Sequence, residues 1–395
     1  MSPATPTMQP ERVSRNIVIG AGLLLAVGIA VVSMTIGPSL GSTGQSMVGF
    51  LIREAAYVVV GLVGFSFFFG VTQRQLSLLW PVISAGSLAA LVAVPFIGTE
   101  ANGSKRWISL WALTLQPSEI YKFAVCVGLP FALARYVPRY SKVTVWMVSL
   151  DSKVMVWMVS LVGLPFILKQ PDLGTSIVVG LISFAIMWTV GLETHHLQRA
   201  LLLAVVGGLL SLIVQPYQRS RLFNLYFSSY CDPQGACYQV NQARIGMGSG
   251  GLVGTGPARA RSLWGFLPNA HTDFIISVIG EMFGFIGVSI IVGLFCYLIY
   301  FCGQSALQAI DPTSRLIALG GTVWLGAEAL INIAQAVGIF PVTGIPLPFV
   351  SYGGTAMVMN MSLVGLLANI AANQGVRRSG GVAFRSVAKN LLRRT

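Results

Sequence analysis

Long apolar runs recur along almost the whole chain, and they limit its folds more than any other feature does. Of the 395 residues, 54% are hydrophobic and only 9% are charged. A soluble domain carries about 25% charged residues, which keep its surface wetted, so this chain has too few for a soluble fold. Disorder requires the opposite bias and is excluded as well. The sequence therefore predicts an all-α polytopic membrane protein.

Ten of these runs are predicted to span a bilayer, because a spanning helix needs roughly 20 mostly apolar residues. They cover residues 16–36, 55–71, 76–97, 118–134, 154–168, 174–190, 200–214, 274–301, 316–337 and 357–372. They define a transmembrane domain of residues 16–372, between a polar tail of residues 1–15 and a basic tail of residues 373–395. Residues 215–273, between the seventh and eighth predicted helices, form a loop long enough to build a site outside the membrane.

The placement of lysine and arginine predicts the orientation, because the cytoplasmic loops of membrane proteins carry an excess of positive charge. With the N-terminus inside, 14 basic residues lie on the inner side and ten on the outer side, five of them in the long loop. Long loops cross the membrane regardless of charge, so the short loops and the tail decide, and both termini are predicted to be cytoplasmic. The same bias accounts for the net charge of +13, so no nucleic-acid partner is expected.

Several common catalytic motifs are absent or lack their structural context. Residues 246–251 match G-x-G-x-x-G but follow no predicted strand, so they do not indicate a dinucleotide site. P-loop, GxSxG and HExxH motifs are absent, and the three histidines form no ligand set. Cys231 and Cys237 share the long loop and would form a disulfide if that loop faces an oxidising compartment. The remaining candidates for chemistry are carboxylates and basic residues at the predicted outer face.

Asp273 is the most informative of these candidates, because it stands where the polar loop becomes an apolar helix. An aspartate in this place can cap the helix by accepting hydrogen bonds from its first backbone N–H groups. It can also serve as a general base held at the membrane surface. Ser277 and Glu281 follow at i+4 and i+8, so they share one helical face with it. An acid within a span, such as Glu281, marks a functional or partner-paired position.

Two further clusters lie at predicted outer boundaries. Lys105, Arg106 and Trp107 suit a phosphate-bearing lipid headgroup, and they equally suit an ordinary interfacial anchor. Glu119 and Lys122 are three residues apart at the start of the fourth predicted span, so they can form an ion pair, either structural or functional.

Other polar and irregular features also fall on the outer side. Asp172 is another acid at a span boundary, with helix capping as the alternative interpretation. The long loop carries five arginines, whose guanidinium groups match phosphate oxygens, so they favour an anionic substrate. Residues 340–354 are apolar but rich in proline and glycine. Such a segment predicts a re-entrant or cavity-lining stretch rather than a plain surface loop.

Seven stretches, taken in order, resemble the SEDS family (shape, elongation, division and sporulation), whose members include RodA and FtsW. They are KRWI at 105–108, QPSE at 116–119 with Lys122, QPDLGT at 170–175, YQ at 238–239, GSGGLVGTG at 248–256, LPNAHTDF at 267–274 and GIPLPFVSYGG at 344–354. The chain departs from the family pattern at Met282, where a second acid usually follows Glu281. A near-perfect tandem copy over residues 141–161 also lengthens the region between the fourth and fifth spans.

The resemblance implies a ten-helix protein of the bacterial cytoplasmic membrane. It implies a peptidoglycan glycosyltransferase that polymerises lipid II at the outer face during cell elongation or division. The expected partners are lipid II, undecaprenyl pyrophosphate and a class B penicillin-binding protein. The resemblance assigns Asp273 as the catalytic residue. The substrate-binding residues expected with it are Lys105, Arg106, Trp107, Glu119, Lys122, Asp172, Arg221 and Glu281.

Two questions stay open at the level of sequence. A lipid II flippase is the alternative function, because broken backbone and acids within spans are also features of transporters. No inverted repeat between the two halves is evident, which counts against that alternative. No cofactor is certain; a divalent cation, Mg²⁺ or Mn²⁺, is left open and its ligands are unknown.

Overall fold

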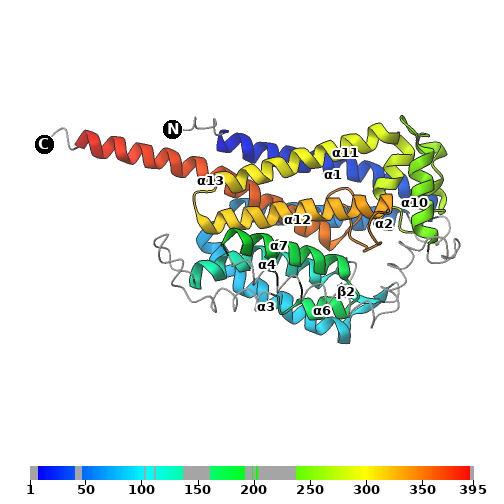
Figure 1. Cartoon of the computed structure of the whole chain (residues 1–395), viewed down its shortest axis with the longest axis horizontal. Helices are drawn as coiled ribbons and strands as arrows, with labels where there is room; N and C mark the ends of the chain where they lie inside the picture. The colour runs from blue at the N-terminus through cyan, green and yellow to red at the C-terminus, as the bar shows by residue number, and fades with distance from the viewer. Residues whose placement is uncertain are drawn as a thin grey trace.

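The protein is a bundle of long helices with roughly parallel axes (Figure 1). The computed structural model describes residues 8–40, 47–101, 104–110, 113–136, 161–191, 198, 202 and 237–391. Six of the described helices are long and apolar enough to cross a membrane. They are α1 (Pro10–Leu40), α2 (Met47–Gly70), α3 (Gln73–Ile97), α11 (Ile275–Gln308), α12 (Pro312–Val337) and α13 (Thr355–Leu391). Two further helices, α4 (Pro117–Tyr136) and α7 (Leu173–Thr189), lie beside α12 in the bundle.

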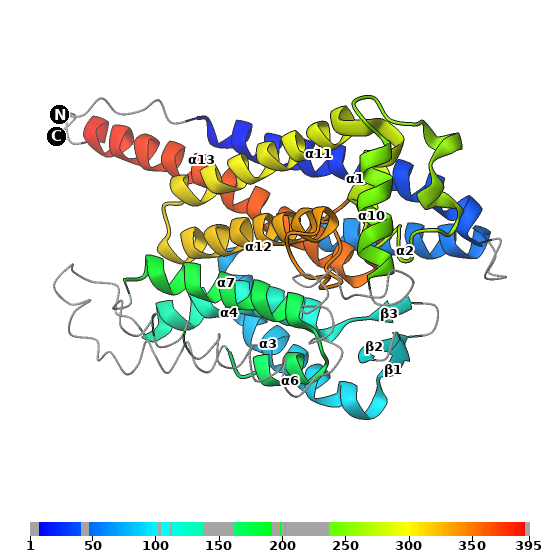
Figure 2. The same ribbon diagram turned by 45° about the vertical axis from the view of Figure 1, so that its right-hand side comes forward.

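The structure confirms an all-α polytopic membrane fold. Eight of the ten predicted spans coincide with these eight helices. Of the predicted span 154–168 only residues 161–168 are described, and they include most of the short helix α6 (Leu164–Lys169); of the predicted span 200–214 only residue 202 is described. Helix α1 starts at Pro10, within the predicted N-terminal tail, and α13 continues into the predicted basic tail as far as Leu391. Because α1 begins and α13 ends at the same end of the bundle, the two termini share one side, as predicted (Figures 1 and 2).

Small residues allow the helices to pack closely, as expected where lipid offers no hydrophobic driving force between helices. Helix α13 packs against α2 and α1, and α11 packs against α1 and α12. At Gly365 of α13, an added Cβ would overlap the main chain of Phe65 in α2, so only glycine permits this approach. The α2–α13 contact therefore depends on backbone proximity rather than on large side chains.

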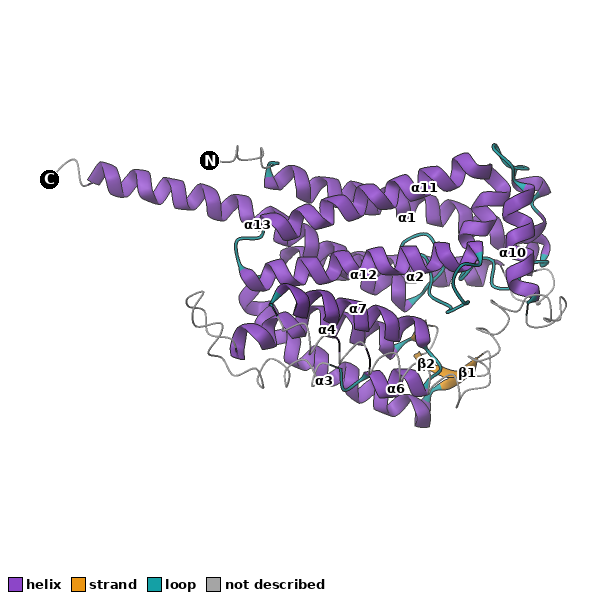
Figure 3. Cartoon of the chain, in the orientation of Figure 1, coloured by secondary structure: helices purple, strands orange, loops and turns teal. Residues whose placement is uncertain are grey.

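A small antiparallel sheet lies at the end of the bundle away from the termini (Figure 3). It consists of β1 (Thr99–Ala101), β2 (Ser104–Leu110) and β3 (Leu113–Leu115), in the order β1-β2-β3. Residues 98–117 lie between the predicted spans 76–97 and 118–134, where the sequence predicts a loop and no strands. The pair Asn102-Gly103, between β1 and β2 in the sequence, is a typical hairpin signal and could have revealed the sheet.

The long loop also contains more structure than predicted. Helix α10 (Tyr238–Ser249) and the short 3₁₀ helices η2 (Pro257–Arg259) and η3 (Arg261–Trp264) precede α11. Helix α10 runs across the end of the bundle rather than along it (Figure 2). We call this end, which holds β1–β3, α10 and the turn before α11, the loop end.

Helix α11 is broken at Gly284, whose φ of 65° and ψ of −162° are not helical. The glycine-rich stretch that follows α10 pairs with the backbone groups that the break releases. Thr255 N–H donates to Glu281 O at 2.9 Å, and Phe285 N–H donates to Gly251 O at 2.9 Å. The glycines of GSGGLVGTG therefore bring two main chains into contact, which explains this motif without any nucleotide.

We expect Gly284→Ala to lower the free energy of unfolding by more than about 2 kcal/mol. Alanine is strained at this positive φ, and its Cβ would lie 2.5 Å from Gly254 N and Leu252 O. Thermal unfolding of the purified protein measures the change. The matched control is Gly293→Ala on the same helix, where nothing lies within 4 Å of the added Cβ. Its effect should stay within about 1 kcal/mol; equal effects of the two variants would contradict this account of the break.

Candidate active site

Asp273 lies in the turn before α11, at the loop end. The N-cap residue of α11 is Phe274, which makes no side-chain cap hydrogen bond, and Asp273 stands one residue before it. The side chain is half-buried, and its main-chain N–H donates to Asn269 O at 3.1 Å. Its main-chain O accepts from Asn332 Nδ2 at 3.1 Å and from Gln335 Nε2 at 3.0 Å.

The segment of residues 340–354 packs against this turn. As predicted, it is not helical, and most of its side chains are buried in protein rather than exposed as on a surface loop. Its polar groups are paired internally, for example Leu347 N–H with Ser351 Oγ at 2.9 Å. A Cβ added at Gly344 would lie 3.8 Å from Asp273 Oδ2, so the carboxylate faces the main chain of this segment. The structure thus joins two of the predicted stretches, LPNAHTDF and GIPLPFVSYGG.

An aromatic cluster holds the two stretches together on the side of α2. The His271 ring lies 5.6 Å from Phe50 and 6.0 Å from Tyr352, and Tyr352 N–H donates to His271 O at 2.9 Å. Burial lowers the pKa of His271 from its ordinary value of 6.5, and burial also raises the pKa of Tyr352 to about 12. Both side chains are therefore neutral at physiological pH.

The lowered pKa of His271 predicts a loss of stability in acid. The folded protein keeps this ring neutral, while the unfolded chain takes up a proton as the pH falls below 6.5. The stabilisation is therefore complete above that value and is lost as the pH falls through the folded pKa. We expect the Tm to fall between about pH 7.5 and about pH 5, and to fall less in His271→Gln. Equal slopes for the two proteins would contradict this assignment.

Glu119 and Lys122 form a buried ion cluster with a third residue, Glu328 of α12. Lys122 Nζ lies 2.8 Å from Glu119 Oε1 and also pairs with Glu328 Oε1. Asn360 Nδ2 donates to Glu328 Oε2 at 3.3 Å, and Lys122 Nζ lies 5.1 Å from the centre of the Trp324 ring. All three charged residues are at most 2% exposed. The predicted ion pair is present within α4, and the contact of Lys122 with Glu328 joins α4 to α12.

Sequence analysis missed Glu328. The signal was available, because Glu328 is an acid inside the predicted span 316–337, and an acid at such a position marks a functional or paired site. Its partner could not be read from the sequence, since Lys122 lies 206 positions away.

Asp172 caps α7 and is linked to the start of α4. Its Oδ1 accepts from Thr175 N–H, and its Oδ2 accepts from Gln116 Nε2 and Ser118 Oγ, each at 3.2 Å. The side chain is 3% exposed. Helix capping, the alternative to a binding role, is therefore present. Asp172 also contacts Ser118, the residue that directly precedes Glu119 in α4.

The three residues of the KRW motif lie in β2 and differ in exposure. Arg106 is buried and donates to Gln170 O at 2.8 Å and to Pro171 O at 2.5 Å, so it anchors the sheet to the turn before α7. Lys105 is exposed and Trp107 is half-buried. Of the three, Lys105 is the side chain most accessible to an anionic ligand.

The structure gives Glu281 a clear set of contacts. Its two carboxylate oxygens accept the main-chain N–H groups of Arg261, at 2.7 Å, and Ser262, at 3.0 Å, at the start of η3. It therefore holds the end of the long loop against α11. Cys237 is in a disulfide, while Cys231, its predicted partner, and Arg221 lie outside the described residues.

Whether a divalent cation takes part stays open, as it is at the level of sequence. In the described ranges no three or more His, Cys, Asp or Glu side chains come together to hold a metal ion.

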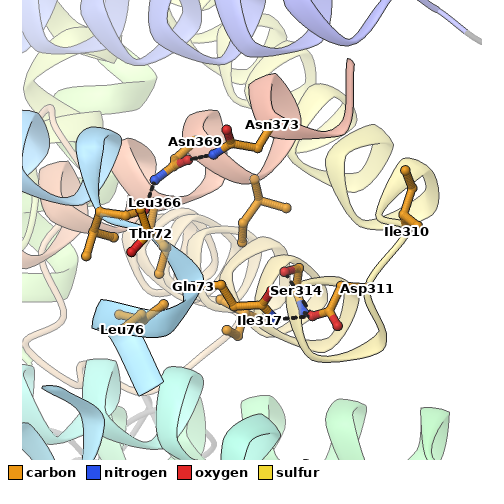
Figure 4. Close-up of a pocket in the computed structure, with 12 residues that line it drawn as sticks. Thr72, Gln73, Leu76, Ile310, Asp311, Ser314, Ile317, Leu366, Asn369 and Asn373 are labelled. Atoms are coloured by element: carbon orange, nitrogen blue, oxygen red, sulfur yellow. Dashed lines mark hydrogen bonds between the residues drawn. The ribbon is translucent and has the colours of Figure 1, made fainter. Parts of the chain in front are cut away.

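The opposite end of the bundle contains a cavity of about 340 Å³ between the α2–α3 turn, the start of α12, and α13 (Figure 4). Asp311 caps α12 there by accepting from Ser314 N–H at 2.9 Å, and it also accepts from the Gln73 amide. Asn369 donates to Phe68 O at 2.9 Å and Val71 O at 2.6 Å. These contacts connect helices at the end of the bundle away from Asp273.

The fold and the site define a polytopic membrane protein with an acid, Asp273, at the loop end of its bundle. A family model described as "Cell cycle protein", which covers FtsW, RodA and SpoVE, matches residues 14–375. The chain belongs to this family, and it is a multi-pass protein of the bacterial cytoplasmic membrane.

Individual relatives agree with this assignment. The chain is 33% identical over 333 residues to a probable peptidoglycan glycosyltransferase FtsW of Trichlorobacter lovleyi, covering 82% of this chain and 84% of that protein. Its fold matches a chain of a peptidoglycan synthase complex with a TM-score of 0.70 at 27% identity, covering 90% and 98% of the two chains. It also matches the rod shape determining protein RodA of Thermus thermophilus with a TM-score of 0.63 at 26% identity, covering 91% and 96%.

Proposed function

We propose that this protein is a peptidoglycan glycosyltransferase that polymerises lipid II into glycan strands at the outer face of the cytoplasmic membrane. The observation that carries the proposal is the position of Asp273. Its carboxylate lies at the loop end, one residue before the N-cap of α11, and faces Gly344 of the buried segment 340–354. The FtsW name of the sequence relatives supports the same activity.

The proposed reaction is a glycosyl transfer with inversion. Asp273 removes the proton from the 4-hydroxyl of the acceptor sugar while that oxygen attacks the anomeric carbon of the donor. Undecaprenyl pyrophosphate leaves as an anion, so it needs stabilisation of its charge rather than a proton. Among the described residues of the predicted binding set, Lys105 is exposed and suits this task, whereas the Arg106 guanidinium donates to two carbonyl groups.

The proposed partner is a class B penicillin-binding protein, which would cross-link the strands as they form. The matching chain in a complex that coordinates polymerization and crosslinking supports this pairing. Cell elongation and cell division are both compatible with the proposal, since the relatives include RodA and FtsW proteins.

The test is to incubate the purified full-length protein with lipid II, alone and with its penicillin-binding partner, and to look for glycan strands. Polymer is the expected product. A parallel assay in liposomes with labelled lipid II addresses the flippase alternative. Movement of the label across the bilayer without any polymer would reject the enzyme and favour the transporter.

A further inference from the structure

Two buried amide side chains of α12, Asn332 and Gln335, hold the turn that carries Asp273. They are three residues apart, so they project from one face of the helix, and both are 0% exposed. Each donates to the main-chain O of Asp273, Asn332 from Nδ2 at 3.1 Å and Gln335 from Nε2 at 3.0 Å. This carbonyl group therefore receives two hydrogen bonds from α12.

The same amides also hold the segment 340–354. Asn332 Nδ2 donates to Ile345 O at 2.8 Å, and Gln335 Oε1 accepts from both N–H and Oγ1 of Thr343 at 3.0 Å. The orientation of the Asn332 amide is determined, because its nitrogen faces two carbonyl oxygens, and only a donor can pair with them. Each amide thus bridges the turn before α11 and the segment 340–354.

These bridges join two stretches that are neither helix nor strand. Buried carbonyl groups require partners, and the two amides supply them for Asp273 O and Ile345 O. Gly344 lies between the two bridged residues, Thr343 and Ile345, and faces the Asp273 carboxylate. The rigid helix α12 therefore sets the position of this carboxylate relative to the segment that it faces.

We propose that Asn332 and Gln335 are positioning residues for glycan polymerisation. They hold the Asp273 carboxylate at the acceptor hydroxyl by fixing its main chain to α12 and to residues 343–345, and they act through Asp273 rather than on the substrate. The proposal rests on the function proposed above, in which Asp273 is the base.

The test uses Asn332→Leu and Gln335→Met, which remove the donors and keep similar side-chain volumes. A misplacement of about 1 Å can lower a catalytic rate by about 100-fold, so we expect kcat for lipid II polymerisation to fall by about 10- to 100-fold in each variant. The KM should change by less than about twofold, because the bridges form in the absence of substrate. If either variant gives too little folded protein, Asn332→Ala or Gln335→Ala removes the same donor without added bulk or charge, with the same expected fall.

A control separates positioning from a general loss of packing. Asn369→Leu removes a buried amide that donates to two main-chain carbonyl groups at the opposite end of the bundle. This control should keep kcat within about threefold of the original protein, even where its Tm falls.

The outcomes are distinguishable. A kcat unchanged per folded molecule, or a rise in KM alone, would overturn the positioning role. So would a fall in kcat of equal size in Asn369→Leu. Unimpaired polymerisation by Asp273→Asn would instead reject the assigned base, whatever the amide variants show.

Discussion

Asp273→Asn is expected to lower the rate of lipid II polymerisation by about 100- to 10,000-fold, the usual contribution of a general base. Asparagine has the same shape but cannot accept the proton from the acceptor hydroxyl. The fold should be preserved, because α12 holds residue 273 by two hydrogen bonds to its main-chain O, which the substitution leaves in place. Single-turnover polymerisation by the purified variant measures the rate, and the Tm confirms that the protein is folded.

The matched control for this variant is Asp311→Asn. Asp311 is also an acid beside the start of a helix, but it caps α12 in the cavity at the opposite end (Figure 4). Asparagine caps a helix about as well as aspartate, so this control should keep both its stability and its polymerisation rate. A polymerisation rate in Asp273→Asn equal to that of the control would end the assignment of Asp273 as base.

Lys122→Met is expected to lower the free energy of unfolding by about 3–5 kcal/mol, the cost of leaving a buried charge without its partner. Lys122 neutralises Glu119 and Glu328, which are 2% and 0% exposed, so its loss leaves two carboxyl groups facing each other inside the bundle. Unfolding of the purified protein in detergent, induced by heat or by denaturant, measures the change in free energy.

Two further variants test why Lys122→Met should lose stability. Lys169→Met removes an exposed lysine and should change stability by less than about 1 kcal/mol. Combining Lys122→Met with Glu119→Gln and Glu328→Gln removes every charge of the cluster and should recover much of the stability. If Lys122→Met is as stable as the original protein, the cluster does not hold α4 to α12.

The features that sequence analysis predicted well are those with a local cause. Apolar runs of spanning length located eight helices that the structure describes, and proline and glycine spacing identified segment 340–354 as non-helical. The small sheet β1–β3 and helix α10 were missed, because they form at the loop end, where no long apolar run marks them. Their signals, such as Asn102-Gly103, are short and weak beside those of the spans.

In the candidate site, too, the residues with a local sequence signal were predicted and those without one were not. Asp273, Glu119, Lys122 and Asp172 were identified from their type and their places at span boundaries. Helix capping was an alternative role for both Asp172 and Asp273, and only the structure distinguishes them. Asp172 caps α7, whereas Asp273 stands one residue before the N-cap of α11. Asn332 and Gln335 went unnoticed, because an amide in an apolar span carries no charge to mark it.

The sequence by itself determined that this chain crosses a membrane many times, which way its basic residues orient it, and which acids stand at the outer boundaries. Those properties follow from composition and spacing within a few helical turns. Only the tertiary structure decided which groups meet: Lys122 with Glu328, 206 positions apart, and Asp273 with Asn332 and Gln335, 59 and 62 positions apart. The physical reason is that a buried polar group must find a partner wherever helix packing places one, and the choice among distant partners is made by the packing.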